Sequence, residues 1–376
     1  MRFIWLGALV MAFGGARSSP AQDARFDFVS LSVRIELSPP FGGAVESLKF
    51  EKHDQCRYRN EGTKARGDDV ARPPGAFAHH VSPERLKRLN ELLKKTQWLT
   101  APGGDGPATH THPTKITLTL EREGAERTLV CHGQRPEPYA ALLRELLGVA
   151  AQERRIYLHD YVSGRAGSDA WDEVGRELAA LRGEPYAENP LPIEYERYAP
   201  IAVRIVRNFY GQTDEELCTA IRLVGHLKIA AELAPLHKLA HDRSAKVRYE
   251  VAWALERIHS PNSLDVLASM MEAPSGRETG WRLIQWGEDA VPHIVRRIAR
   301  STDPKLEPRE NTQGEEMVRA YLEHWDRVSQ PIDPRVVEAV RAALAAKPAE
   351  NGQIRTTYLT EFLQKLESRP ATSKAP

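Results

Sequence analysis

Between residues 198 and 304 the sequence repeats its apolar pattern at a constant shift. Laying Thr213 on Ser244 (244 − 213 = 31) aligns five further apolar positions: Ala220 with Val251, Val224 with Leu255, Leu227 with Ile258, Leu233 with Leu264, and Leu236 with Leu267. Each copy has apolar residues at i, i+4 and i+7, then a short break and a second apolar run, which predicts two amphipathic helices. Because one such pair cannot bury both of its faces, the pairs must stack on their neighbours.

The second copy, residues 244–271, resembles the HEAT-like repeat seen in phycobilin-lyase-type and many other bacterial proteins. The likeness is carried by Val247-Arg248, Ala252, Ala254-Leu255 and residues 264–267. The glycine typical of this repeat after its first helix is Glu256 here, whereas Gly225 stands at the equivalent place one copy earlier. The resemblance implies an all-α HEAT-like helical repeat solenoid over residues 198–304 and carries no activity with it, since such repeats serve many functions.

Flanking segments extend this interpretation. Residues 281–298 resemble a further unit, with a Gly-x-x-Ala-Val-Pro join at 287–292. We expect residues 305–368 to form diverged helical repeats or a cap, because terminal repeats are usually atypical. Residues 369–376 are expected to be a disordered tail, and residues 163–197 a linker with one helix.

The N-terminal half predicts a small α+β domain over residues 22–162. Apolar and polar residues alternate from Val29 to Leu37 and from Ile116 to Leu120, which indicates half-buried strands. Ser82-Pro83 begins a helix, since serine caps free amides and proline fits the first helical position. The order of strands, helix, hairpin and helix favours an antiparallel sheet with two helices on one face. Residues 79–89 and 113–120 resemble small domains of unknown function in exported bacterial proteins.

Residues 1–21 are typical of a secretory signal peptide. Arg2 precedes an apolar run from Phe3 to Phe13, and Ser19-Pro20-Ala21 offers a cleavage site with small residues. This run is too short for a membrane span, which needs about 20 apolar residues. We therefore expect an exported protein, periplasmic or extracellular, with no membrane attachment after the leader is removed.

Charge and cysteine content exclude several classes of protein. The chain has 52 Lys and Arg against 51 Asp and Glu, so its net charge of +1 gives no indication of nucleic-acid binding. Three cysteines are too few for a disulfide-rich scaffold and form no CxxC motif. Cys56 and Cys131 fall on candidate strands of one domain and could form a disulfide in an oxidising compartment. Cys218 falls on an apolar helix face and is expected in the core.

Motifs of common enzyme classes are absent from the sequence: it contains no P-loop, GxGxxG, GxSxG or HExxH pattern. No cofactor is therefore predicted. His110 and His112 share the side of an extended segment, and together with His132 they form the best candidate for a metal site. A metal-dependent hydrolase or other metal-binding enzyme using this region is the alternative function, set against the simpler interpretation of solvated loop histidines.

The leading prediction is a non-enzymatic interaction scaffold that binds a protein or peptide. The resemblance to HEAT-like repeats implies that the second helix of each pair lines the concave surface where partners bind. A basic stripe on this surface would comprise His237, Lys238, His241, His293, Arg296, Arg297 and Arg300. The alternative for these residues is an ordinary solvated helix face.

Overall fold

The computed structural model describes most of the chain, in segments. The described residues are 30–36, 45–51, 54–61, 74–96, 115–122, 125–132, 139–162, 164–181, 191–242, 244–270, 282–283, 286–290, 292–294, 334–345, 360–361, 363–365 and 367–368. The chain divides into two compact units, Met1–Tyr157 and Leu158–Pro376.

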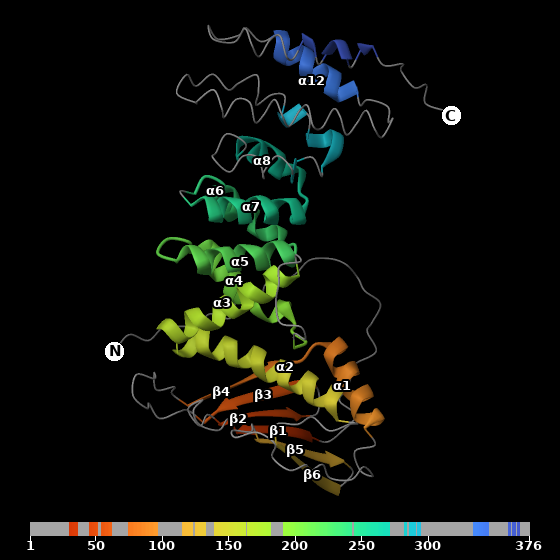
Figure 1. Ribbon diagram of the computed structural model, residues 1–376, viewed down its shortest axis with the longest axis vertical. Coiled ribbons are helices and arrows are strands. Elements are labelled where there is room, and N and C mark those ends of the chain that lie inside the picture. Colours follow the sequence, from red (N-terminus) through yellow and green to blue (C-terminus); the bar gives the residue numbers. More distant parts are fainter. Residues whose placement is uncertain are drawn as a thin grey trace, which may run out of the picture. The chain divides into compact units, whose positions relative to one another are not determined.

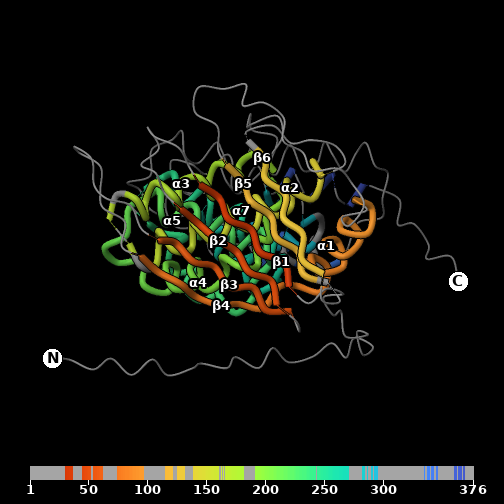
Figure 2. Tube along the Cα trace, turned by 90° about the horizontal axis from the view of Figure 1, so that it is seen from below, coloured from red at the N-terminus to blue at the C-terminus, as the bar shows by residue number. Residues whose placement is uncertain are grey.

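The described part of the first unit contains one antiparallel sheet. Its strands are β1 (Ser30–Glu36), β2 (Val45–Glu51), β3 (Gln55–Asn60), β4 (Gly75–His80), β5 (Lys115–Arg122) and β6 (Ala125–His132). The order across the sheet is β4-β3-β2-β1-β5-β6, and Figure 2 shows these strands side by side. The predicted antiparallel sheet is therefore confirmed, and β1 joins its two halves.

One face of this sheet is apolar because its strands alternate with a period of two. Leu31, Val33 and Ile35 of β1 are at most 1% exposed. Their partners on the two adjacent strands are also buried: Phe50, Leu48 and Glu46 on β2, and Leu120, Leu118 and Ile116 on β5. Glu46 is the exception to the apolar pattern in this row.

Helices α1 (Pro83–Lys95) and α2 (Ala140–Tyr157) lie on the same side of the sheet (Figure 1). Ser82 caps α1, since its Oγ accepts a hydrogen bond of 3.1 Å from the Arg85 amide. Leu86, Leu89 and Leu93 then repeat at helical spacing and are buried. Sheet and helices together enclose the core of the first unit.

Helices make up the described part of the second unit. They include a π-helical turn (Leu158–Val162), α3 (Gly164–Ala180), α4 (Ala199–Arg207), α5 (Asp214–His226), α6 (Leu233–Leu239), α7 (Ala245–Ile258), α8 (Leu264–Met270) and α12 (Pro334–Ala345). Short 3-10 helices lie at Tyr195–Tyr198, Ala230–Glu232, Pro261–Ser263 and Gly287–Ala290. The segment 163–197, expected to be a linker with one helix, contains α3. This helix packs along α5: Ser168 Oγ donates to Glu216 Oε1 at 2.9 Å, and Trp171 Nε1 donates to the Glu216 carbonyl at 3.1 Å.

The backbone of this unit repeats at the shift that the sequence predicts. Thr213 caps α5, and Ser244 caps α7 at the equivalent position of the next copy. Lys228 and His259, which are equivalent by the same shift, follow these helices with left-handed φ angles of 53° and 56°. Helices α6 and α8 begin at Leu233 and Leu264, again equivalent positions. In these two successive helix pairs, the first helix, the turn after it and the second helix therefore begin at equivalent residues.

Several predictions lie outside the described residues: the leader (1–21), the start of the expected cap (305–333) and the tail (369–376). Within the part of the chain that the structure describes, no helix is long and apolar enough to cross a membrane.

Candidate functional site

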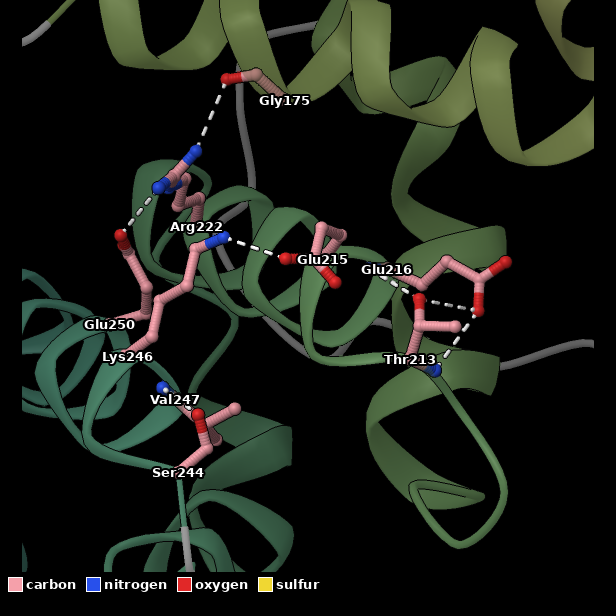
Figure 3. A network of polar contacts seen from close by, with 9 residues as sticks. All are labelled: Gly175, Thr213, Glu215, Glu216, Arg222, Ser244, Lys246, Val247 and Glu250. Carbon is pink, nitrogen blue, oxygen red and sulfur yellow. Dashed lines mark hydrogen bonds and ion pairs between the residues drawn. The ribbon is translucent and has the colours of Figure 1, made fainter.

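Neighbouring helix pairs are tied together by polar contacts along the row of α3, α5 and α7 (Figure 3). Lys246 Nζ donates to Glu215 Oε1 at 2.9 Å, and these two residues are themselves one repeat apart. Arg222 Nη2 donates to Glu250 Oε1 at 2.7 Å, and its Nη1 reaches the Gly175 carbonyl on α3 at 3.4 Å. Glu250 is 1% exposed, so this ion pair between neighbouring helix pairs is buried.

Gly225 sets how closely α5 and α7 approach. A Cβ added there would lie 2.6 Å from Ala254 Cα and 2.9 Å from its Cβ. Such distances are below normal contact, so only glycine permits this crossing. The glycine typical of the repeat therefore has a packing role in this copy.

The second helices form their own row through contacts between α4, α6 and α8. Arg207 on α4 reaches Glu232, just before α6, with Nη2 at 2.6 Å and Nε at 3.0 and 3.1 Å from the carboxylate oxygens. Glu232 is 1% exposed. The sequence analysis did not predict this pair. The one indication in the sequence is that Arg207 is basic and lies one repeat before Lys238, a residue of the predicted basic stripe.

The predicted basic stripe falls on this row, but most of its described members are engaged within the protein. His237 Nε2 lies 3.2 Å from Ser263 Oγ, and burial lowers the pKa of His237. His241 Nε2 lies 3.4 Å from Ser269 Oγ on α8. Lys238 is exposed.

The later members of the stripe lie beyond α8. His293 Nδ1 is 2.6 Å from Asp265 Oδ1. Asp265 and Ser269 are one turn apart on α8, so His241 and His293 approach the same helix from the two neighbouring pairs. Arg296, Arg297 and Arg300 lie outside the described residues. Among the described members, Lys238 and His241 are exposed.

The candidate metal site cannot be assembled from the described part of the chain. His110 and His112 lie outside it. His132 is the last residue of β6, and its side chain is outside it too. Where the structure describes side chains, no group of three or more His, Cys, Asp and Glu is placed to hold a metal ion.

The possible disulfide between Cys56 and Cys131 is not compatible with the sheet. Cys56 lies on β3 and Cys131 on β6, with β2, β1 and β5 between them. Four strand spacings of about 4.8 Å put them about 19 Å apart, far beyond the reach of about 7 Å for a disulfide. Cys56, Cys131 and Cys218 are all buried, and none of them forms a disulfide.

A buried polar cluster in the first unit was also not predicted. Arg85 on α1 is 1% exposed and donates from Nε to Glu145 Oε1 on α2 at 3.0 Å. Glu46 on β2 is fully buried, and its carboxylate accepts hydrogen bonds from Arg154 Nε at 2.6 Å and Nη2 at 2.8 Å. Because each buried charge has an opposite partner, these pairs fasten α1 to α2 and α2 to the sheet.

Comparison with known proteins identifies only the repeat. No curated protein gives a significant match. One matching solved structure is that of an engineered protein, a target of the Northeast Structural Genomics Consortium. It is 14% identical, with a match that covers 57% of this chain and 96% of that chain, and its TM-score of 0.31 does not establish a shared fold. Residues 211–285 match the family model of HEAT repeats. The C-terminal half of the chain therefore contains a HEAT-like repeat region, as the sequence predicts.

Proposed function

We propose that the protein is a non-enzymatic interaction scaffold that binds a protein or peptide on the row of second helices, α4, α6 and α8. The observation that carries this proposal is the HEAT repeat match over residues 211–285, together with helix pairs that recur at a constant shift. Stacked pairs of this kind form a solenoid whose extended surface suits an extended partner.

The contacts of the second-helix row support the choice of surface. Arg207 joins α4 to the segment before α6, and His237 and His241 join α6 to α8. The row is therefore held together internally, which leaves other side chains for a partner. Lys238 is exposed on α6, and it is the proposed contact residue.

The proposed location is the periplasm or the cell exterior. This part of the proposal rests on the leader expected in residues 1–21.

A capture experiment with matched variants tests the proposed surface. The full mature chain and the variants Lys238→Glu and Arg176→Glu would be used to capture proteins from the envelope fraction, with quantitative mass spectrometry as the readout. Arg176 is an exposed residue of α3, so its variant reverses the same charge on the other row. We expect a partner that the wild type and Arg176→Glu retain and that Lys238→Glu loses by about tenfold, the effect of about 1.4 kcal/mol.

Two results would contradict the proposal. One is equal capture by all three proteins, because the partner would then not contact the second-helix row. The other is stoichiometric zinc in the purified protein that disappears in a His110→Ala, His112→Ala variant, which would favour the metal-dependent alternative.

A further inference from the structure

Strand β4 is an edge of the sheet whose outer side has no neighbouring strand within the described residues. It pairs with β3 on one side only, and Figure 2 shows it at the border of the sheet. The other edge strand, β6, carries the charged residues Glu126 and Arg127, which discourage the addition of a further strand. The β4 sequence, GAFAHH, has no proline, lysine or carboxylate that would do the same.

The backbone of β4 directs hydrogen-bonding groups outward at alternate residues. The Val81 amide donates to the Asp54 carbonyl at 2.8 Å, one step beyond the pairing of β4 with β3. Residue pairs of an antiparallel ladder are hydrogen-bonded at every second step, so the amides and carbonyls of Ala76, Ala78 and His80 point away from β3. Within the described residues, no backbone hydrogen bond reaches these outward groups. They are the groups that an added strand would bind.

The side chains at the same three positions leave the outward backbone accessible. Ala76, Ala78 and His80 are exposed, and two of the three have only a methyl group. Opposite the two alanines on β3 stand Arg59 and Arg57, which are also exposed. A strand added beside β4 would lie two strand spacings, about 9.6 Å, from β3, with only the alanine methyl groups in between. Glutamate side chains on the added strand can therefore reach both guanidinium groups.

The two arginines are only weakly engaged within the described part of the sheet. Arg57 Nη2 lies 3.4 Å from Glu51, and its side chain is 61% exposed, so water screens this contact. Glu51 also pairs with Lys49 at 3.4 Å. Arg59 has no ion pair among the described residues. Exposed positive charge beside an open strand edge favours an acidic partner.

The other face of β4 sets a second requirement for the added strand. Phe77 points toward the helix side of the sheet, where its ring lies 5.3 Å from that of Tyr58, and it is half-buried. The core therefore ends at Phe77. An apolar side chain on the added strand would extend the core past this ring, because side chains of adjacent strands pack against each other.

We propose that the β4 edge binds an extended peptide segment in which acidic and apolar side chains alternate, added as an antiparallel strand. Its backbone bonds to the outward groups of β4, its acidic side chains pair with Arg57 and Arg59, and its apolar side chains pack beside Phe77. A second copy of this chain fits less well, because its own β4 has no carboxylate for the arginines. This surface belongs to the first unit, so the inference is independent of the second-helix row.

Fluorescence anisotropy with a labelled peptide, TEVEVET, and the full chain tests the proposal. We expect saturable binding of this peptide and none of TKVKVKT. In an antiparallel pair the glutamate amides face β4 and the valine amides face away. Methylation of the glutamate amides should therefore abolish binding, whereas methylation of the valine amides should have little effect.

Variants of the chain test the same contacts from the side of the protein. Ala78→Pro removes an outward amide without breaking a bond to β3, and it should weaken binding by about tenfold, the upper end of one hydrogen-bond contribution. Ala78→Ser keeps the amide and is its control. Reversing both arginines, Arg57→Glu with Arg59→Glu, should weaken binding by about tenfold, the size of two exposed ion pairs. Lys115→Glu, on β5 four strands away from β4, is the matched control and should not.

Four results would overturn the proposal. They are no binding of TEVEVET, equal binding of TKVKVKT, binding that methylated glutamate amides do not reduce, and binding that the double arginine variant retains. A wild-type dimer that becomes monomeric in Ala78→Pro on sedimentation would also overturn it, because a second copy would then occupy the edge. If Ala78→Pro does not fold, the methylated peptides still decide.

Discussion

Replacing Gly225 with alanine tests the closest packing contact of the helical stack. The new Cβ would lie 2.6 Å from Ala254 Cα, whereas ordinary contacts begin near 3.4 Å, so α5 and α7 must separate by about 0.8 Å. Overpacking of this kind costs about 1–3 kcal/mol, and the upper half of that range applies because the obstacle is backbone. Alanine recovers about 1 kcal/mol through its helix propensity. We expect a net loss of about 1–2 kcal/mol.

The assay is urea unfolding followed by far-UV circular dichroism, with Gly175→Ala as the matched control. A Cβ at residue 175 would meet the hydroxyl end of the Thr219 side chain rather than backbone. That hydroxyl can rotate away, so the cost should be roughly balanced by the gain in helix propensity. The reasoning is refuted if Gly225→Ala is as stable as the wild type, or if Gly175→Ala loses as much.

Three further predictions concern single contacts. Thr213→Ala should lower the free energy of unfolding by about 1 kcal/mol, because it removes the hydroxyl that accepts from the Glu216 amide and donates to the Glu216 carboxylate at the start of α5. Thr213→Ser should retain most of this stability, and denaturant midpoints decide. Arg154→Met leaves the buried Glu46 carboxylate without its cation and should lower the free energy of unfolding by about 3 kcal/mol. An added Glu46→Gln change should partly restore it, so equal stability of the single and double variants would contradict this prediction. A thiol reagent should label no cysteine in the folded protein, because all three are buried and burial raises the pKa of Cys218 to about 12. In denaturant without reductant it should label three cysteines, whereas a single labelled thiol would indicate a disulfide.

The repeat register was predictable because it depends on local patterns. Apolar spacing fixes where each helix buries its face, and Thr213 and Ser244 mark the helix starts by their capping chemistry. The structure keeps the same shift at the helix caps and at the left-handed turns of Lys228 and His259.

Strand β4 and the strand order were harder to predict. The β4 sequence, GAFAHH, alternates small with larger residues and lacks the β-branched residues that mark strands. Strand order depends on contacts between distant segments, which no local pattern reports. For this reason the sequence could place Cys56 and Cys131 on strands of one domain but could not show that three strands separate them.

The helix that carries His237 and Lys238 could be predicted, but the contacts of the stripe residues could not. Helical spacing placed these two residues on a second helix, and the structure has them on α6. The spacing could not show that His237 faces Ser263 or that His293 faces Asp265, because these are contacts between pairs. The Arg207–Glu232 pair was missed for the same reason.

The central claim is that equivalent residues of successive pairs lie side by side, and zero-length cross-linking tests it most directly. A carbodiimide joins a lysine amine to a carboxylate only when they touch. Lys246 and Glu215 are 2.9 Å apart, and their side chains are 52% and 58% exposed. We predict an amide between these two residues, alongside the positive control between Lys115 and Glu36 in the sheet, which are 3.3 Å apart. Formation of the control link without the Lys246–Glu215 link, or attachment of Lys246 to a carboxylate elsewhere, would contradict the stacked register.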